Sequence, residues 1–385
     1  MPKKSKILFI APFPPPFAGP ENSAKTFIES PVNDKYEIIK YNTNFRKSNA
    51  DKGKVGVKMI FAFFQLNYRL IKALVSHKPK IVYFYVTATM LGWIGKDIWV
   101  IIISKLFGSK VVIHMRAGHF RKNYDLASKL VKKLIKFTLN QTDFNLGQSY
   151  TLAEQYSSIV KDDNKIGFVY NMINVSKYKV SFDNYDPNII LFLGHLSFAK
   201  GYCDILKIIP EVSERFPNVK FCFAGTKKSV ERNILFNNLT GESLVFEDPE
   251  QVYQDYVKGS YDNNYSYLGK LGEVEKIEWL KKCNLFVLPS YSEGFSTAVL
   301  EAIATGKPII TTQVGGLVDI IDNGENGFLI KPGEKEDLKN SILKLLSDSS
   351  LRSQMAKNNE ILRGDFALEN VSNEYVKLFD SLVRK

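Results

Sequence analysis

The 385-residue chain is poor in cysteine and has no long apolar run. Its three cysteines, Cys203, Cys222 and Cys283, lie at unrelated spacings, which excludes a disulfide framework and favours a reducing compartment. The longest internal apolar run, residues 98–103, is far shorter than the ~20 residues that span a bilayer. The apolar residues 7–11 behind the basic N-terminus are too few for a signal peptide. These absences predict a cytoplasmic protein.

Two further absences narrow the range of reactions that the protein could catalyse. No cluster of His, Cys, Asp and Glu has the spacing of metal ligands, so no metal is expected. The loop after the first expected strand, APFPPPFAGPENSAKTF (11–27), does not contain the G-x-G-x-x-G motif that binds dinucleotides. This argues against a hydride-transfer enzyme, and no cofactor is expected.

Apolar runs of strand length alternate with helical patterns along the whole chain, which predicts an α/β fold with doubly wound parallel sheets. The length exceeds one core, so two domains are expected, 1–180 and 181–367, joined at the polar stretch 181–188. A last helix at about 368–385 is expected to pack back on the first domain. The predicted strands are 6–12, 36–42, 81–85, 110–115, 144–149, 188–196, 219–225, 265–271, 285–290, 308–312 and 327–330.

Charge is unevenly distributed. Residues 1–180 have 29 Lys and Arg against 11 Asp and Glu, whereas the remainder has 23 against 29. A basic first half indicates an anionic partner, whether nucleic acid, a membrane surface or an acidic glycan. Of these the membrane surface is favoured, and nucleic acid is not expected. Within 125–143, apolar Leu130, Leu134 and Phe137 form one helical stripe beside Lys129, Lys132, Lys133 and Lys136. This helix either lies on anionic lipid or packs its stripe on the core with a solvated lysine face.

The stretch PSYSEGFSTAVLEAIATGKP (289–308) carries the strongest functional signal. It reads as the end of a buried strand, a loop with Glu293, and a helix with Glu301 that starts near Ser296 or Thr297 and stops at Gly306. Carboxylates accept hydrogen bonds from sugar hydroxyls, and a helix N-terminus attracts phosphate. The pattern therefore points to a sugar nucleotide, although two solvated acids would be the simpler interpretation of the spacing alone.

Read together with VGG (314–316) and NGFLI (326–330), this stretch resembles the retaining glycosyltransferases of family 4, of the group 1 type. The resemblance covers about fifty residues in unbroken order. It implies the GT-B fold, in which two Rossmann-like domains face each other across a cleft, with acceptor in the first domain and donor in the second. It also implies transfer of a hexosyl group from a nucleoside-diphosphate sugar to a glycan or lipid-linked glycan. By analogy we expect a role in bacterial surface polysaccharide synthesis, with the enzyme cytoplasmic or peripheral on the inner membrane face.

The resemblance assigns site residues one by one. In FLGHLSFAKGYCDIL (192–206), Lys200 matches the lysine that binds the donor diphosphate, and His195 stands where an arginine is usual. Imidazole is a weaker cation than guanidinium, so His195 either becomes partly protonated or receives help from the other domain. The expected donor site comprises Gly19, His195, Lys200, Lys270, Leu271, Glu293, Gly294, Phe295, Ser296, Thr297 and Glu301. Of these, Glu293 is expected to hold the sugar and Glu301 the ribose.

A last window, VVIHMRAGHFRKNY (111–124), follows the fourth expected strand. Many relatives have a histidine here near the anomeric carbon, and His114, Arg116 and His119 compete for that position. A buried structural histidine is the alternative for His114. Two other functions stay open: a sugar-nucleotide epimerase on the same architecture, and a non-catalytic partner subunit, for which the unusual His195 would be a symptom.

Overall fold

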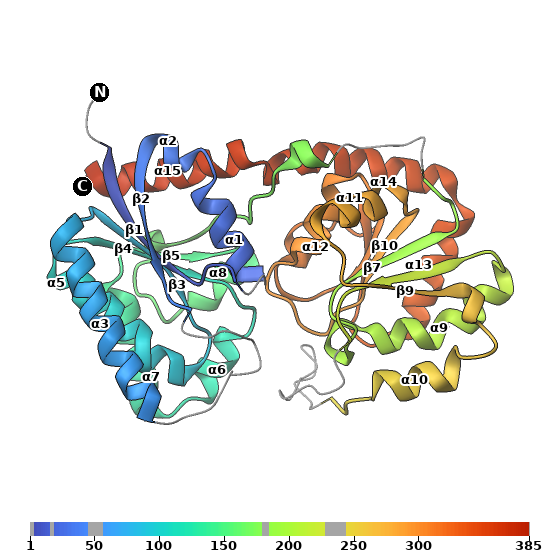
Figure 1. Ribbon diagram of the computed structural model, residues 1–385, viewed down its shortest axis with the longest axis horizontal. Helices are drawn as coiled ribbons and strands as arrows, with labels where there is room; N and C mark the ends of the chain where they lie inside the picture. Colours follow the sequence, from blue (N-terminus) through green and yellow to red (C-terminus); the bar gives the residue numbers. More distant parts are fainter. Residues whose placement is uncertain (1–3, 16–18, 45–56, 179–184, 228–243, 385) are drawn as a thin grey trace. The chain divides into compact units, whose positions relative to one another are not determined.

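The computed structural model describes residues 4–15, 19–44, 57–178, 185–227 and 244–384. The chain divides into two compact units (Figure 1), one made of Met1–Met172 and Ala367–Lys385 and the other of Ile173–Phe366. The first crossing between units thus comes before the expected boundary at residue 180, and residues 181–184 of the expected linker lie outside the described part of the chain.

The first unit is built on a six-stranded parallel sheet with the order β2-β1-β3-β4-β5-β6. Five of the strands lie where the apolar runs predicted them. The sixth, β6, was not predicted because it has only three residues, with a glycine in the middle. The strands are β1 Ser5–Ala11, β2 Tyr36–Asn42, β3 Ile81–Val86, β4 Lys110–Met115, β5 Phe144–Gly147 and β6 Ile166–Phe168.

Helices cover both faces of this sheet. On one face, α3, α5 and α7 bury Leu70, Ile101 and Ile135 against the strands. On the other face, α1 and the C-terminal α15 bury Phe27 and Tyr375. The helices are α1 Gly19–Ile28, α2 Val32–Lys35, α3 Val57–His77, α4 Met90–Gly92, α5 Ile98–Leu106, α6 Phe120–Leu126, α7 Lys129–Gln141, α8 Tyr150–Ala153 and α15 Leu368–Arg384, with a π-helical turn at Trp93–Asp97.

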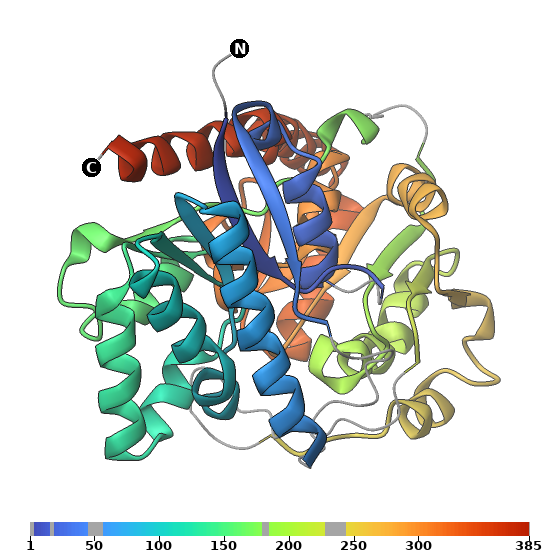
Figure 2. The ribbon, with the colours of Figure 1, turned by 60° about the vertical axis from the view of Figure 1, so that its left-hand side comes forward.

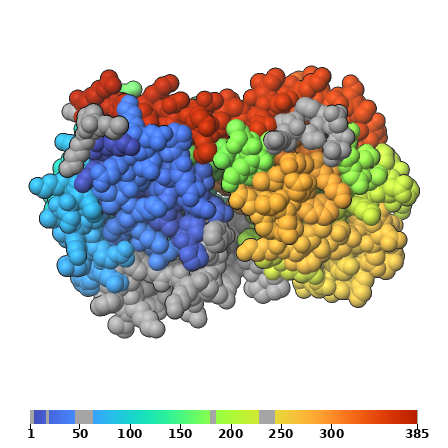
Figure 3. Space-filling model, turned by 45° about the horizontal axis from the view of Figure 1, so that its top comes forward, coloured from blue at the N-terminus to red at the C-terminus, as the bar shows by residue number. Residues whose placement is uncertain are grey.

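The last helix, α15, belongs to the core of the first unit although it is most distant in sequence. Figures 1 and 2 show it beside α2 and the strands of this unit, and in Figure 3 its red residues lie against the blue N-terminal ones. Tyr375 packs on Phe27 with ring centroids 5.0 Å apart, and its hydroxyl lies 2.9 Å from that of Tyr83 on β3. Lys35 and Tyr36 bond to Asp380 on α15. Burial of such aromatic side chains is a large favourable term.

The structure decides against one of the two alternatives for the helix within 125–143, the packing of its apolar stripe on the core. In α7, Leu130 is 77% exposed and Phe137 is 55% exposed. The core face instead carries Ile135 and Leu139, with Leu134 only partly packed. The helical spacing fits two faces of the same helix, and the structure buries the one with Ile135 and Leu139.

The second unit has a parallel sheet with the order β12-β11-β10-β7-β8-β9, which is the 3-2-1-4-5-6 order of a dinucleotide-binding fold. Its strands are β7 Ile189–Leu193, β8 Lys220–Ala224, β9 Tyr265–Gly269, β10 Leu285–Leu288, β11 Ile309–Thr312 and β12 Gly327–Ile330. Its helices are α9 Tyr202–Arg215, α10 Pro249–Tyr256, α11 Glu273–Lys282, α12 Thr297–Ala304, α13 Lys335–Ser347 and α14 Ser349–Leu362. The order reverses between β7 and β10, and ligands of such sheets bind at the carboxyl ends of these two strands.

No helix in the described ranges is long and apolar enough to cross a membrane. All three cysteines are buried thiols.

Candidate donor-binding site

The loops that follow β7 and β10 are joined by main-chain contacts at the reversal point of the second sheet. Gly201 has the left-handed φ of 69°, and a Cβ there would lie only 2.0 Å from the carbonyl oxygen of Pro289. On the same edge, the Tyr291 N–H donates to the carbonyl oxygen of Ala199 at 2.9 Å. Glycine is therefore required at position 201 for the two loops to touch.

This contact brings together the lysine and the first glutamate that the sequence singled out. Lys200 Nζ lies 2.6 Å from Glu293 Oε1, and the Ser290 hydroxyl donates to the same oxygen at 2.7 Å. The lysine side chain is 26% exposed and the glutamate side chain is 9% exposed. Among the described residues no donor bonds Oε2 of Glu293. The pair thus offers an ammonium with donors to spare and a second carboxylate oxygen that can accept a hydroxyl.

The Val-Gly-Gly turn fixes the Glu293 loop from the other side. Gly315 has a φ of +56°, and a Cβ on it would lie 2.3 Å from the Glu293 carbonyl oxygen. The Gly316 N–H donates to the Gly294 carbonyl oxygen at 2.8 Å. The motif had been recognised in the sequence without a role. In the structure its first glycine allows the close approach that holds the glutamate in place.

Helix α12 starts directly behind this loop, as predicted, at Thr297 with Ser296 as its N-cap. The Ser296 side chain makes no cap hydrogen bond, so the first N–H groups of the helix have no side-chain acceptor within the described residues. Such a terminus is a binding place for an anion. Phe295 beside it is buried, and its ring centroid lies 6.2 Å from that of Phe366.

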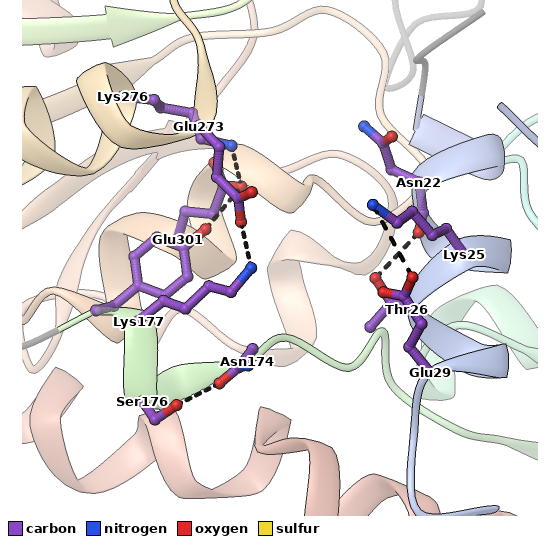
Figure 4. A network of polar contacts seen from close by, with 11 residues as sticks. Asn22, Lys25, Thr26, Glu29, Asn174, Ser176, Lys177, Glu273, Lys276 and Glu301 are labelled. Carbon is purple, nitrogen blue, oxygen red and sulfur yellow. Dashed lines mark hydrogen bonds and ion pairs between the residues drawn. The ribbon is translucent and has the colours of Figure 1, made fainter. Parts of the chain in front are cut away.

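The second glutamate lies one turn into α12 and has two partners that sequence patterns missed. Tyr178 donates its hydroxyl to Glu301 Oε1 at 3.1 Å, and Lys276 on α11 forms an ion pair with the same oxygen. Figure 4 shows Lys276 and Glu301 together with the neighbouring ion pair of Lys177 and Glu273, which measures 2.7 Å. Burial, and next the Glu301 carboxylate, raise the pKa of the Tyr178 hydroxyl, which keeps it a donor. No described residue donates to Oε2 of Glu301.

Tyr291 anchors the loop between β10 and α12, and sequence patterns missed it as well. Its ring stacks on Phe198 with centroids 4.8 Å apart, and its hydroxyl is hydrogen-bonded to Asp204 on α9. Burial raises the pKa of Asp204 from 3.8 to about 6. The only sequence signal was position, two residues before Glu293.

The remaining second-unit candidates lie on the neighbouring strand-end loops. His195, exposed, has its Nδ1 atom 2.7 Å from the Thr226 hydroxyl in the loop after β8. Lys270 is exposed and Leu271 half-buried in the turn after β9, directly behind Gly269 with its φ of +72°. All four loops therefore leave the same edge of the sheet, because its strands are parallel.

In the first unit, the three candidates His114, Arg116 and His119 lie in different surroundings. His114 is completely buried: its Nδ1 lies 2.7 Å from the Tyr83 hydroxyl and 3.3 Å from that of Tyr375. Burial, and next the nearby Arg116, hold the pKa of this imidazole well below 6.5, so it is neutral. This is the structural alternative that the sequence left open for His114.

Arg116 and His119 lie past the end of β4. Arg116 is half-buried, with its guanidinium 4.6 Å from the Tyr85 ring centroid, and it bonds to the Ser23 hydroxyl on α1. His119 is exposed at the N-cap of α6, without a side-chain cap bond. Gly19 begins α1, and an added Cβ there would meet no atom within 4 Å. No crowding within the described chain explains this glycine.

The described residues contain no group of three or more His, Cys, Asp or Glu side chains that would hold a metal ion.

The two α/β units, each built on a parallel sheet, define the class of protein. The chain has the GT-B fold of glycosyltransferases. HepE of Anabaena, whose structure was solved in complex with UDP, matches with a TM-score of 0.72 over 98% of this chain and 100% of that chain. The sequence identity is 16%, so this likeness concerns the fold.

Sequence comparison then gives the family. Residues 176–361, nearly the whole second unit, match the family Glycosyl transferases group 1. An uncharacterized glycosyltransferase of Methanocaldococcus jannaschii is 27% identical over 284 residues, 73% of this chain and 68% of that protein. The N,N'-diacetylbacillosaminyl-diphospho-undecaprenol alpha-1,3-N-acetylgalactosaminyltransferase of Campylobacter jejuni is 40% identical over 121 residues, 31% of each chain. The second unit is therefore similar to the group 1 glycosyltransferases, and the chain resembles glycosyltransferases over most of its length.

Proposed function

We propose that the protein transfers a hexosyl group from a nucleoside-diphosphate sugar to a glycan or lipid-linked glycan, with retention of the anomeric configuration. The observation that carries this proposal is the Lys200–Glu293 pair at the reversal point of the second sheet, beside the uncapped start of α12. It joins a cation for the diphosphate to a carboxylate for the sugar. The fold of HepE, which was solved with UDP, is consistent with such a donor.

The diphosphate is the group that gains charge as the sugar leaves. Lys200 uses one of its three donors on Glu293, which leaves two for phosphate oxygens. The first N–H groups of α12, His195 and the main chain at Gly19 add further donors under this proposal. Preorganised donors of this kind stabilise a developing anion without reorganisation, which is the usual main source of rate enhancement.

The carboxylates have separate roles in the proposed complex. Glu293 accepts sugar hydroxyls with Oε2, and its charge steadies an oxocarbenium-like transition state. Glu301 accepts the ribose hydroxyls with its own Oε2, while Tyr178 and Lys276 hold Oε1. The base lies against the main chain of Lys270 and Leu271.

From the first unit we propose Arg116 and His119, rather than the buried His114, as the groups that meet the anomeric centre. Arg116 is held in place by Tyr85 and by Ser23 of α1, so its orientation is fixed before substrate arrives. His114 then serves by supporting the strand end from within the core.

We propose that the first unit binds the acceptor and that the pathway is bacterial surface polysaccharide synthesis on the inner face of the cell membrane. Two observations support this. The relative from Campylobacter jejuni is named for a diphospho-undecaprenol acceptor. Residues 1–180 carry 29 basic against 11 acidic residues, which suits an anionic surface.

The epimerase is less well supported, because it would need catalytic acids from both units. Asp125, the residue that follows the Arg116 window, is an exposed surface residue that pairs with Arg121 at 3.0 Å. A non-catalytic subunit is disfavoured by the intact set of Lys200, Glu293 and Glu301.

One experiment separates the three. Purified protein is incubated with UDP-, GDP-, ADP- and dTDP-sugars, with and without an undecaprenyl-diphosphate-linked saccharide, and nucleoside diphosphate is measured. Release that depends on the acceptor, with an α-linked product from an α-linked donor by NMR, is expected. Epimerised sugar without acceptor dependence would establish the epimerase, and no turnover with any donor would leave a non-catalytic subunit.

A further inference from the structure

The helical layer formed by α3, α5 and α7 has apolar side chains on both of its faces. Toward the sheet it buries residues such as Leu70 and Ile101. On the opposite side, α3 exposes four large side chains at the spacing i, i+4, i+7 and i+11: Phe64, Tyr68, Ile71 and Val75. Phe64 is 64% exposed and Tyr68 is 68% exposed. A surface helix usually carries polar residues there, so this second stripe needs its own explanation.

Helix α5 packs beside α3, and α7 packs beside α5 (Figures 1 and 2). On α5, Trp99 is 43% exposed, and its ring meets Phe63 of α3 edge-on with centroids 5.6 Å apart. On α7, Leu130 and Phe137 point outward. We call the outward side of these three helices the α3–α5–α7 face. Exposed apolar side chains gathered on adjacent helices in this way mark a site of interaction.

The same face is basic. Helices α3, α5 and α7 contain no Asp or Glu at all. The exposed bases among their described side chains are Arg69, Lys72, Lys129, Lys133 and Lys136. In α3, Lys72 flanks the apolar stripe, so its long stem can run along an apolar surface while its ammonium reaches an anionic layer above.

We propose that the α3–α5–α7 face docks on an anionic lipid bilayer and that Phe64, Tyr68 and Trp99 enter the interface between headgroups and acyl chains. A bilayer offers both an anionic plane and an apolar layer beneath it, which matches bases and apolar side chains on one surface. A second copy of this chain would bring like charges together. Nucleic acid would give aliphatic Ile71 and Val75 no partner. The inference rests on the proposed function, because a lipid-linked acceptor lies in this interface.

The first test is co-sedimentation of the full chain with vesicles of phosphatidylcholine alone and of phosphatidylcholine mixed with phosphatidylglycerol. The parent is expected to bind the anionic vesicles and to detach as salt rises, because the attraction is screened. Reversal of Lys129, Lys133 and Lys136 to Glu is expected to lower binding roughly a hundredfold, at about fivefold or more for each base. Loss of apolar burial in Phe64→Ser with Tyr68→Ser is expected to lower it about tenfold.

Matched controls lie on the second unit. Ile361 is 79% exposed and Tyr256 is 42% exposed, so Ile361→Ser with Tyr256→Ser removes similar apolar surface elsewhere. The exposed Lys220, Lys258 and Lys357 can be reversed in the same way. Both controls are expected to bind vesicles like the parent. All the substituted side chains are exposed, so unchanged thermal unfolding is expected to show that the variants fold.

Fluorescence distinguishes entry into the interface from adsorption by charge. Trp99 should shift to the blue with anionic vesicles. Trp99→Phe should abolish the shift, because Trp93 is already buried and Trp279 lies on α11 of the second unit, outside this face. Binding without a shift would overturn the entry of aromatic side chains. Equal binding by parent and face variants would overturn the docking surface. Self-association of the parent, lost in the Phe64 and Tyr68 variant and unaffected by vesicles, would assign the face to a second copy.

Failure of this inference and failure of the proposed function give different results. Binding of UDP and GDP is measured calorimetrically for the same proteins. Nucleotide binding without vesicle binding would refute the docking face alone. Vesicle binding without nucleotide binding or turnover would refute the proposed function and leave the face standing.

Discussion

Replacement of Lys200 by methionine tests whether this side chain contacts the donor or only neutralises Glu293. In the structure its ammonium lies 2.6 Å from Glu293 Oε1, and the glutamate side chain is 9% exposed. Without the lysine, the carboxylate keeps only the Ser290 hydroxyl. Unpairing a fully buried charge costs about 3–5 kcal/mol, and we expect about 2–3 kcal/mol here because Lys200 is 26% exposed. For a domain of this size that corresponds to a fall in Tm of roughly 4–12 °C.

Affinity for nucleoside diphosphate should fall independently of this loss. Charge-assisted hydrogen bonds to phosphate contribute about 1.5–3 kcal/mol, so Lys200→Met should bind the preferred nucleoside diphosphate roughly 10–150-fold more weakly. The double variant with Glu293→Gln removes the unpaired charge. It should recover most of the Tm of the parent but none of the nucleotide affinity.

Differential scanning fluorimetry and isothermal titration of the parent, both single variants and the double variant complete the cycle. If nucleotide affinity returned together with Tm in the double variant, Lys200 would act on the donor only through the Glu293 loop. The diphosphate role would then be refuted, and the lysine would be a structural partner of the glutamate.

Five other substitutions extend the test. Gly315→Ala and Gly324→Ala both place a side chain at positive φ, which should cost about 1–2 kcal/mol of stability in Gly324→Ala. Only at Gly315 would the Cβ also meet main-chain oxygens, so Gly315→Ala should lose more stability and should lose turnover as well. Glu301→Ala should weaken donor binding by roughly 1–3 kcal/mol in titrations, and unchanged binding would remove it from the ribose site. Burial raises the pKa of Asp204 from 3.8 to about 6, so the folded state holds the carboxyl proton more tightly than the unfolded state. The contribution of this group to stability is therefore greatest below pH 3.8 and falls as the pH rises through about 6. Asp204→Asn should therefore remove up to about 3 kcal/mol of the decline in urea-unfolding free energy between pH 4 and 7, and an unchanged decline would contradict the assignment. His195→Arg should retain or strengthen nucleotide binding at pH 8, whereas the parent should bind nucleotide better below about pH 6.5. If the affinity of the parent did not change with pH and the variant lost binding, His195 would lie away from the diphosphate.

Sequence patterns predicted the strands well because those of a doubly wound sheet are buried on both faces and read as apolar runs. They failed at β6, where three residues cannot form such a run. At α7 they left open whether the stripe of Leu130 and Phe137 faces the core or outward, because local spacing does not say what lies opposite a side chain.

The residues of the candidate site also fall into those that sequence motifs identified and those that only the fold revealed. Lys200, Glu293 and Glu301 stand in motifs and could be identified from order along the chain. Tyr178 and Lys276, which hold Glu301, come from segments with no motif, since a single tyrosine or lysine can be placed only by the fold. The reason for the first glycine of Val-Gly-Gly also became visible only in three dimensions.

The return of α15 to the first unit has a consequence for the order in which the two cores form. The second unit is one continuous segment, Ile173–Phe366, so its core needs no residue from beyond Phe366. The first unit is translated earlier, but it lacks Tyr375 and Phe379, which fill one face of its sheet, until the last residues leave the ribosome. We therefore expect the N-terminal half to wait for the end of the chain, so that a chain truncated after residue 366 would hold a protease-resistant second unit and a protease-sensitive first one.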